Sequence, residues 1–108
     1  MSTSLTLDTV RSDNGAPVLL AVGEIDLSNI DTFAQALGTA TAEAASSGAT
    51  LTVDLSGVEY LDSAAINALF THSDHIRVIA HVLLMRSLTL SGLSELVSVE
   101  PAPPAPQG

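Results

Sequence analysis

Cysteine is absent from the 108-residue sequence. The chain therefore has no disulfide framework, no thiol nucleophile and no thiolate ligand for a metal. The absence of cysteine is in keeping with a cytoplasmic location, which is where we expect the protein to work.

Lysine is also absent, and three arginines face twelve carboxylates, which gives a formal net charge of -9. Nucleic-acid binding depends on Lys and Arg that neutralise phosphates, so we expect no direct contact with DNA or RNA. The same charge disfavours anionic membranes and favours a protein partner with a basic face.

Long hydrophobic runs are missing as well. The unbroken apolar segments are only a few residues long, and His81 interrupts the most apolar region, so we expect no membrane span. The N-terminal segment lacks the basic region and apolar block of a signal peptide.

The motifs of several enzyme classes are missing too: a glycine-rich phosphate loop, a G-x-S-x-G elbow and a Cys/His pair. Asp54 resembles the phospho-acceptor aspartate of receiver domains, but those domains need a late lysine, and this chain has no lysine. We therefore predict a protein that is not an enzyme and that carries no cofactor.

The hydrophobic fraction of 46 % is enough for a folded core. A chain of this length forms one domain, which we place at residues 1–100. Residues 101–108 are rich in proline with almost no apolar anchor, and we expect them to be a disordered or extended tail.

Residues 50–70 change their hydrophobic period at one point. Leu51, Val53 and Leu55 alternate with polar residues, which is typical of a strand with one buried face. After Asp62 and Ser63 the apolar spacing becomes helical. We expect a short oxygen side chain at this boundary to cap the helix, and Ser63 is the first candidate for that role.

Earlier in the chain, residues 5–10 and VLLAV at 18–22 predict two strands joined through a turn at 13–15 as a hairpin. The continuous apolar run of the second strand is typical of a strand covered on both faces. Ser28 or Asn29 then caps a helix that ends at Ser47 and Gly48.

After the junction, the helix that starts at Ser63 should reach about His72 to His75. VIAHVLL, from Val78, predicts a strand. Residues 85–90 predict a short helix stopped by Gly92.

Polar residues outside the junction have ordinary explanations. Glu24 and Asp26, at the end of the second strand, are typical of loop caps and solvated charges rather than of an acid/base pair. His72, Asp74, His75 and His81 lack any recognised zinc spacing, so we predict no metal site.

Three segments resemble the boxes of STAS domains, the fold of bacterial anti-sigma factor antagonists. VDLSGVEYLDSAAINAL at 53–69 resembles the central signature, in which an Asp-Ser-(Ser/Thr)-Gly box opens a helix. GEIDLSN at 23–29 resembles the Gly-Glu-(aliphatic)-Asp box, and LTLSGLSEL at 88–96 resembles the late Gly-Leu turn. The three segments occur in the family's order and cover most of the chain.

The resemblance implies an α/β fold with a small mixed β-sheet and helices packed mainly on one face. It also implies that the Asp26 loop and the Asp62 loop lie together on the partner surface. STAS domains fit a helix, a strand and another helix between the central box and the Gly-Leu turn, and the interval from Asp62 to Leu93 looks too short for all three. Either one element is missing or residues 76–90 form a single helix.

One departure from the family matters. In the resemblance Asp62 is the box aspartate and Ser63 the first serine, whereas Ala64 stands where the partner kinase phosphorylates Ser or Thr, and Ala65 replaces the glycine. Three hypotheses follow: the protein is permanently competent to bind its partner, it is phosphorylated one residue early at Ser63, or it serves another partner.

We therefore predict an anti-sigma factor antagonist that binds a kinase-type anti-sigma factor and frees a sigma factor, without the usual phospho-switch. The alternative is a STAS adaptor in another complex, such as lipid transport or a regulatory assembly. The sequence leaves the oligomeric state undetermined. The predicted partner-binding residues are Asp26, Ser28, Asp62, Ser63, Ala64 and Asn67.

Overall fold

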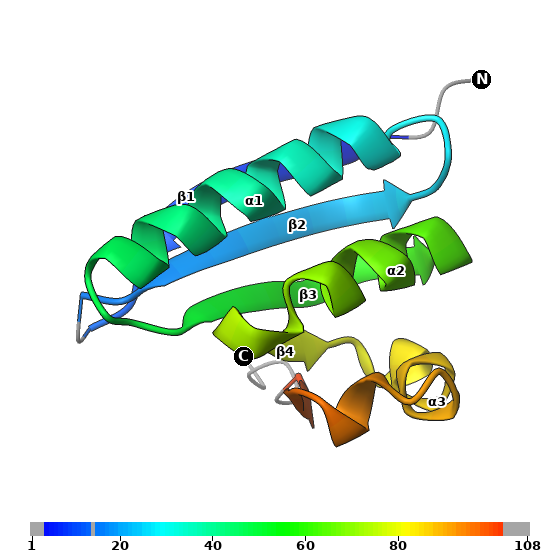
Figure 1. Cartoon of the computed structure of the whole chain (residues 1–108). Helices are drawn as coiled ribbons and strands as arrows, with labels where there is room; N and C mark the ends of the chain where they lie inside the picture. The colour runs from blue at the N-terminus through cyan, green and yellow to red at the C-terminus, as the bar shows by residue number, and fades with distance from the viewer. Residues whose placement is uncertain (1–3, 14, 103–108) are drawn as a thin grey trace, which may run out of the picture.

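The computed structural model describes residues 4–13 and 15–102. Five strands and three helices alternate along most of the chain (Figure 1). The strands are β1 (Leu5–Arg11), β2 (Pro17–Ile25), β3 (Leu51–Leu61), β4 (Ile76–Ala80) and β5 (Ser98–Pro101). The helices are α1 (Ile30–Ser46), α2 (Ser63–Thr71) and α3 (Val82–Leu90), and two short 3-10 helices, η1 (Ser73–His75) and η2 (Leu93–Glu95), follow α2 and α3.

The strands form one sheet in the order β1-β2-β3-β4-β5. β1 and β2 are an antiparallel hairpin, as the sequence predicts, and the other neighbours are parallel. Each parallel pair is joined through a helix, and such crossovers are right-handed, so the three helices come to the same face of the sheet. The mixed sheet with helices on one face is therefore confirmed.

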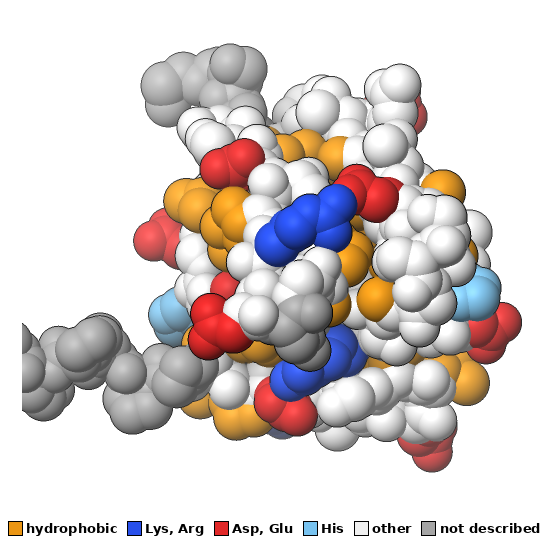
Figure 2. All heavy atoms as spheres, turned by 90° about the vertical axis from the view of Figure 1, so that its left-hand side faces the viewer, with side chains coloured by type: hydrophobic (Ala, Val, Ile, Leu, Met, Phe, Trp, Pro, Cys, Tyr) orange, Lys and Arg blue, Asp and Glu red, His pale blue; other side chains and the backbone are white. Residues whose placement is uncertain are grey.

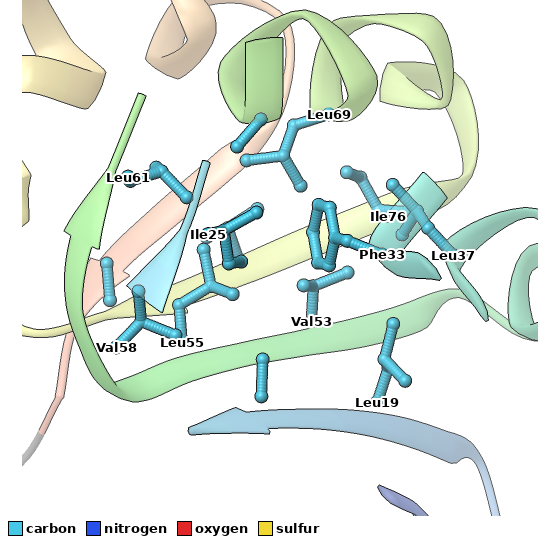
Figure 3. Packing of buried hydrophobic residues seen from close by; sticks show 14 of the residues in the cluster. Leu19, Ile25, Phe33, Leu37, Val53, Leu55, Val58, Leu61, Leu69 and Ile76 are labelled. Carbon is cyan, nitrogen blue, oxygen red and sulfur yellow. The ribbon is translucent and has the colours of Figure 1, made fainter. Parts of the chain in front are cut away.

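The core lies between this face and the helices. Each strand contributes alternate residues, such as Leu51, Val53 and Leu55 from β3, which have no exposed surface. Figure 3 shows the ring of Phe33, from α1, in the middle of this cluster between Val53 and Leu69. None of the helices among the described residues is long and apolar enough to cross a membrane.

The prediction that β2 is covered on both faces is wrong. Leu19 and Ala21 are buried under the helices, but Val18 and Leu20 are only half-buried and Val22 is 53 % exposed. The apolar run alone does not distinguish a strand buried on both faces from one whose second face is partly apolar.

β3 is longer than the alternation of Leu51, Val53 and Leu55 predicts, and it continues without a break to Leu61. The pairing of β2 with β3 shifts register between Leu20 and Val22 and again between Gly23 and Glu24. Such bulges change which residues face the core, and this hides the two-residue period in the sequence.

The interval from Asp62 to Leu93 holds a helix, a strand and another helix, so both the missing element and the single helix over 76–90 are wrong. The three elements fit because α2 and α3 have only nine residues each. The predicted strand from Val78 is shifted: β4 starts at Ile76 and ends at Ala80, and His81 caps α3.

The fifth strand has no counterpart among the predicted elements. β5 pairs in parallel with β4 and includes Glu100 and Pro101, so the sheet extends one residue into the segment expected to be a tail. Residues 103–108, which make up the rest of that tail, lie outside the described residues.

Candidate functional site

Two loops meet where β2 and β3 end side by side. Ile25 and Leu61 are paired residues of these parallel strands, and the next residues are Asp26 and Asp62. The amide of Asp62 donates a hydrogen bond of 3.1 Å to the carbonyl oxygen of Ile25. Residues 26–29 and 62, together with residues 63–67 of α2, therefore form one surface, which we call the corner. It lies at the right-hand end of Figure 1.

The first loop is held by its own side chains. Asp26 Oδ1 accepts hydrogen bonds from the Ser28 amide, at 2.8 Å, and from the Ser28 hydroxyl. Asn29 lies at the N-cap position of α1, but its side chain does not cap the helix. It binds backward instead: Oδ1 accepts from the Asp26 amide at 3.0 Å, and Nδ2 donates to the Glu24 carbonyl at 2.9 Å. These bonds make the Asp26 loop a closed, ordered turn.

The second loop starts α2. The N-cap residue is Asp62, whose Oδ1 accepts from the Ala65 amide at 3.1 Å. The prediction of a capping oxygen at this boundary is confirmed, but the cap is Asp62, and Ser63 is the first helical residue. Ser63 is exposed, so its hydroxyl lies at the surface of the corner.

Ala64 and Ala65 follow Ser63 in the first turn of α2 and fit its backbone. Ala64 is half-buried in the first turn, and Ala65 is buried. All the positive φ angles in the described chain belong to glycines, so Ala65 adopts a helical conformation without strain. Asn67 lies one turn after Ser63 on the same face of α2 and is exposed.

Two exposed apolar residues beside the corner are not among the predicted partner-binding residues. Leu27, inside the Asp26 loop, is 76 % exposed, and Tyr60, two residues before Asp62, is 50 % exposed. A leucine between the polar residues of a loop is the signal that could have indicated Leu27. Tyr60 gives no such signal, because it lies between the alternating residues of the predicted strand and the start of the predicted helix.

The opposite end of the molecule differs in charge. Figure 2, which views that end, shows two basic patches, each beside an acidic one. Two ion pairs, Arg11–Glu43 and Arg77–Glu100, are in keeping with this view. A surface hollow of about 530 Å³, lined in part by Thr50 and Thr52, also lies there, far from the corner.

The histidines are not gathered into a metal site. Within the described part of the chain no three His, Asp or Glu side chains are placed to hold a metal ion. His72 is the C-cap residue of α2, whereas His81 caps α3 by accepting a hydrogen bond of 3.0 Å at Nδ1 from the Leu83 amide. Their positions at helix ends account for both residues structurally.

Comparison with known proteins places this geometry in a family. A search of curated proteins finds no match. Among solved structures, an anti-sigma factor antagonist from Mycobacterium paratuberculosis is similar, with a TM-score of 0.80 and 27 % sequence identity over 92 % of this chain and 87 % of that chain. Unphosphorylated SpoIIAA, also an anti-sigma factor antagonist, has a TM-score of 0.67 at 12 % identity, over 91 % of this chain and 89 % of its own, and shares the fold. The family model described as "Mlab, STAS domain" matches residues 9–99, and the chain therefore belongs to the STAS domain family.

Proposed function

We propose that this protein is an anti-sigma factor antagonist, which binds a kinase-type anti-sigma factor through the corner and so frees a sigma factor. The observation that carries the proposal is the corner itself. It combines the exposed residues Leu27, Ser28, Ser63 and Asn67 with the carboxylates of Asp26 and Asp62. Similarity to the Mycobacterium paratuberculosis antagonist, along most of both chains, supports this role.

The two kinds of residue at the corner contribute differently to binding. Full burial of a large apolar side chain contributes about 1.5–3 kcal/mol, whereas an exposed ion pair contributes about 0–1 kcal/mol. Leu27 should therefore supply most of the affinity. Asp26 and Asp62 should mainly steer a basic partner face toward the corner and fix its orientation.

Ala64 removes the usual means of ending the interaction. A phosphate would add about -1.5 to -2 charges beside Asp62, and this would repel a partner that approaches an acidic surface. Position 64 carries no hydroxyl, so the protein stays competent to bind without a phosphorylation step at this residue. We therefore favour the hypothesis that the protein is permanently competent to bind its partner, because it requires no modification of any residue.

A STAS adaptor in another complex, such as lipid transport, is the second candidate. Ala64 favours it, because an adaptor needs no phosphorylatable residue at this position. Affinity capture from the native cytoplasm separates the two functions. A transporter ATPase as the stable partner, in place of an anti-sigma factor, would establish the adaptor role.

Binding to candidate anti-sigma factors, measured by calorimetry, tests the first proposal. Ser63→Glu and Ala64→Glu should each weaken binding by about tenfold or more, because they place a charge inside the interface. Glutamate in the first turn is compatible with the helix dipole, so both variants should fold. Ser94→Glu is the matched control, since Ser94 is exposed in η2, away from the corner, and this variant should bind like the wild type.

The same mixtures, supplied with ATP, test the absence of the switch. Mass spectrometry should find phosphate on Ala64→Ser and none on the wild type. Phosphate at Ser63 of the wild type would replace permanent competence with a switch moved by one residue. Equal binding of Ser63→Glu, Ser94→Glu and wild type would remove the corner as the docking surface.

A further inference from the structure

The face of the sheet that points away from the helices has its own pattern. In most of the sheet, including β3 as far as Leu55, the residues packed on the core alternate with residues turned to this side, which we call the open face. It is turned away from the viewer in Figure 1. Its apolar residues include Val10, 38 % exposed, and Val22, 53 % exposed.

The strand register aligns one row across all five strands. Asp8 pairs with Leu20, Leu20 with Asp54, Asp54 with Ile79, and Ile79 with Glu100. The row therefore alternates carboxylate and aliphatic residues. Asp8 and Glu100 are exposed, and the three residues between them are half-buried.

Two carboxylates of this row have partners within the protein, and one of these partners is easily exchanged. Asp54 Oδ1 accepts hydrogen bonds from the amide of Ser56, at 2.9 Å, and from its hydroxyl, and these fix the carboxylate. Glu100 forms an ion pair of 3.2 Å with Arg77. Both partners of that pair are about half exposed, so exchanging it for another cation costs little.

The spacing of the row matches one kind of secondary structure. Neighbouring strands lie about 4.8 Å apart, so alternate strands, and their carboxylates, lie about 10 Å apart. Seven residues of an α-helix rise about 10.5 Å, and residues at this spacing lie close to one face. An extended peptide covers about 10 Å in three residues, but these would point to opposite sides, and its backbone would find no partners on a sheet face.

We propose that the open face binds a basic amphipathic α-helix of a partner protein, laid across the strands. Its Lys or Arg residues, seven positions apart, lie opposite Asp8, Asp54 and Glu100, and its apolar residues cover Leu20 and Ile79. A second copy of this chain does not supply such a helix, because it has no lysine and only one of its three arginines, Arg86, lies in a helix of the described chain. This surface is separate from the corner.

A designed peptide tests the proposal with the full chain. The peptide is a capped helix with three lysines at seven-residue spacing and leucines between them; the control peptide has the same composition, with the lysines distributed around the helix. The first peptide should bind the wild type, and the amide NMR signals that move should belong to the open face. Asp8→Lys should weaken this binding by about fivefold or more relative to Asp74→Lys, a matched change at an exposed residue of η1.

Four results would overturn the proposal. Asp8→Lys and Asp74→Lys could weaken peptide binding equally, or the two peptides could bind the wild type equally well. The NMR signals that move could belong only to the corner, or sedimentation could show that the protein self-associates and the peptide does not compete with this association. Ser63→Glu should not change peptide binding. This readout separates failure of the open face from failure of the proposed function at the corner.

Discussion

Asp62 has a structural duty that is separate from any partner. Its Oδ1 accepts the Ala65 amide and so satisfies one of the free N–H groups at the start of α2. We expect Asp62→Ala to lower the free energy of unfolding by about 1 kcal/mol, because the replacement removes the cap. Urea unfolding followed by circular dichroism measures this loss.

Ser63→Ala is the control for the cap. Among the described residues the Ser63 side chain forms no hydrogen bond, so its loss should change the free energy of unfolding by at most a few tenths of a kcal/mol. If Ser63→Ala destabilised the protein as much as Asp62→Ala, the assignment of the cap to Asp62 would be wrong.

At the scale of the elements, the close pairing of the start of β1 with the end of β2 depends on Gly23. This residue has a φ of 117°, and a Cβ atom there would lie 2.3 Å from the carbonyl oxygen of Ser4. The same oxygen accepts a hydrogen bond of 3.0 Å from the Glu24 amide. Gly23→Ala should therefore lower the free energy of unfolding by about 3 kcal/mol, since it adds a backbone clash to an unfavourable φ.

Gly48→Ala isolates the effect of φ. Gly48 has a φ of 71° after α1, and a Cβ atom added there would meet no other atom within 4 Å, so the cost should be about 1–2 kcal/mol. Thermal unfolding of the two variants side by side makes the comparison. Equal losses would show that the contact with Ser4 contributes nothing.

The elements also show what periodicity can predict. The change of period at Asp62 correctly located the β3–α2 junction, because strand and helix place buried residues at different spacings. Periodicity does not locate the β4–α3 boundary, because a short apolar run such as VIAHVLL fits either a strand or a helix. His81, which separates the two, binds through Nδ1 at a cap, and its sequence neighbours give no sign of this.

The candidate site was predictable only in part for a related reason. The family resemblance, rather than periodicity, implied that the Asp26 and Asp62 loops lie together, and the structure places them at the ends of two paired parallel strands. The exposure of Leu27 and Tyr60 depends on how those loops close and how far β3 extends. The sequence pattern predicts neither the closure of these loops nor the length of β3.

At the scale of the molecule, the net negative charge affects both partner binding and stability. The same twelve carboxylates that favour a basic partner also repel one another in the folded state. The two ion pairs offset little of this, because all four side chains are substantially exposed and such pairs contribute about 0–1 kcal/mol each. Added salt should therefore stabilise the protein, because it screens the repulsion between carboxylates more than it weakens the attraction within the two ion pairs.

We accordingly expect the melting temperature to rise when sodium chloride is raised from about 0.01 M to 0.15 M, since the screening length falls from about 30 Å to 8 Å. Calorimetry at constant pH measures the rise. The control is the triple variant Glu59→Gln, Asp74→Asn and Glu95→Gln, which neutralises three exposed carboxylates. It should melt higher than the wild type in low salt and gain less from added salt. A melting temperature that fell with salt in the wild type would mean that local ion pairs, rather than overall repulsion, dominate the electrostatics of the fold.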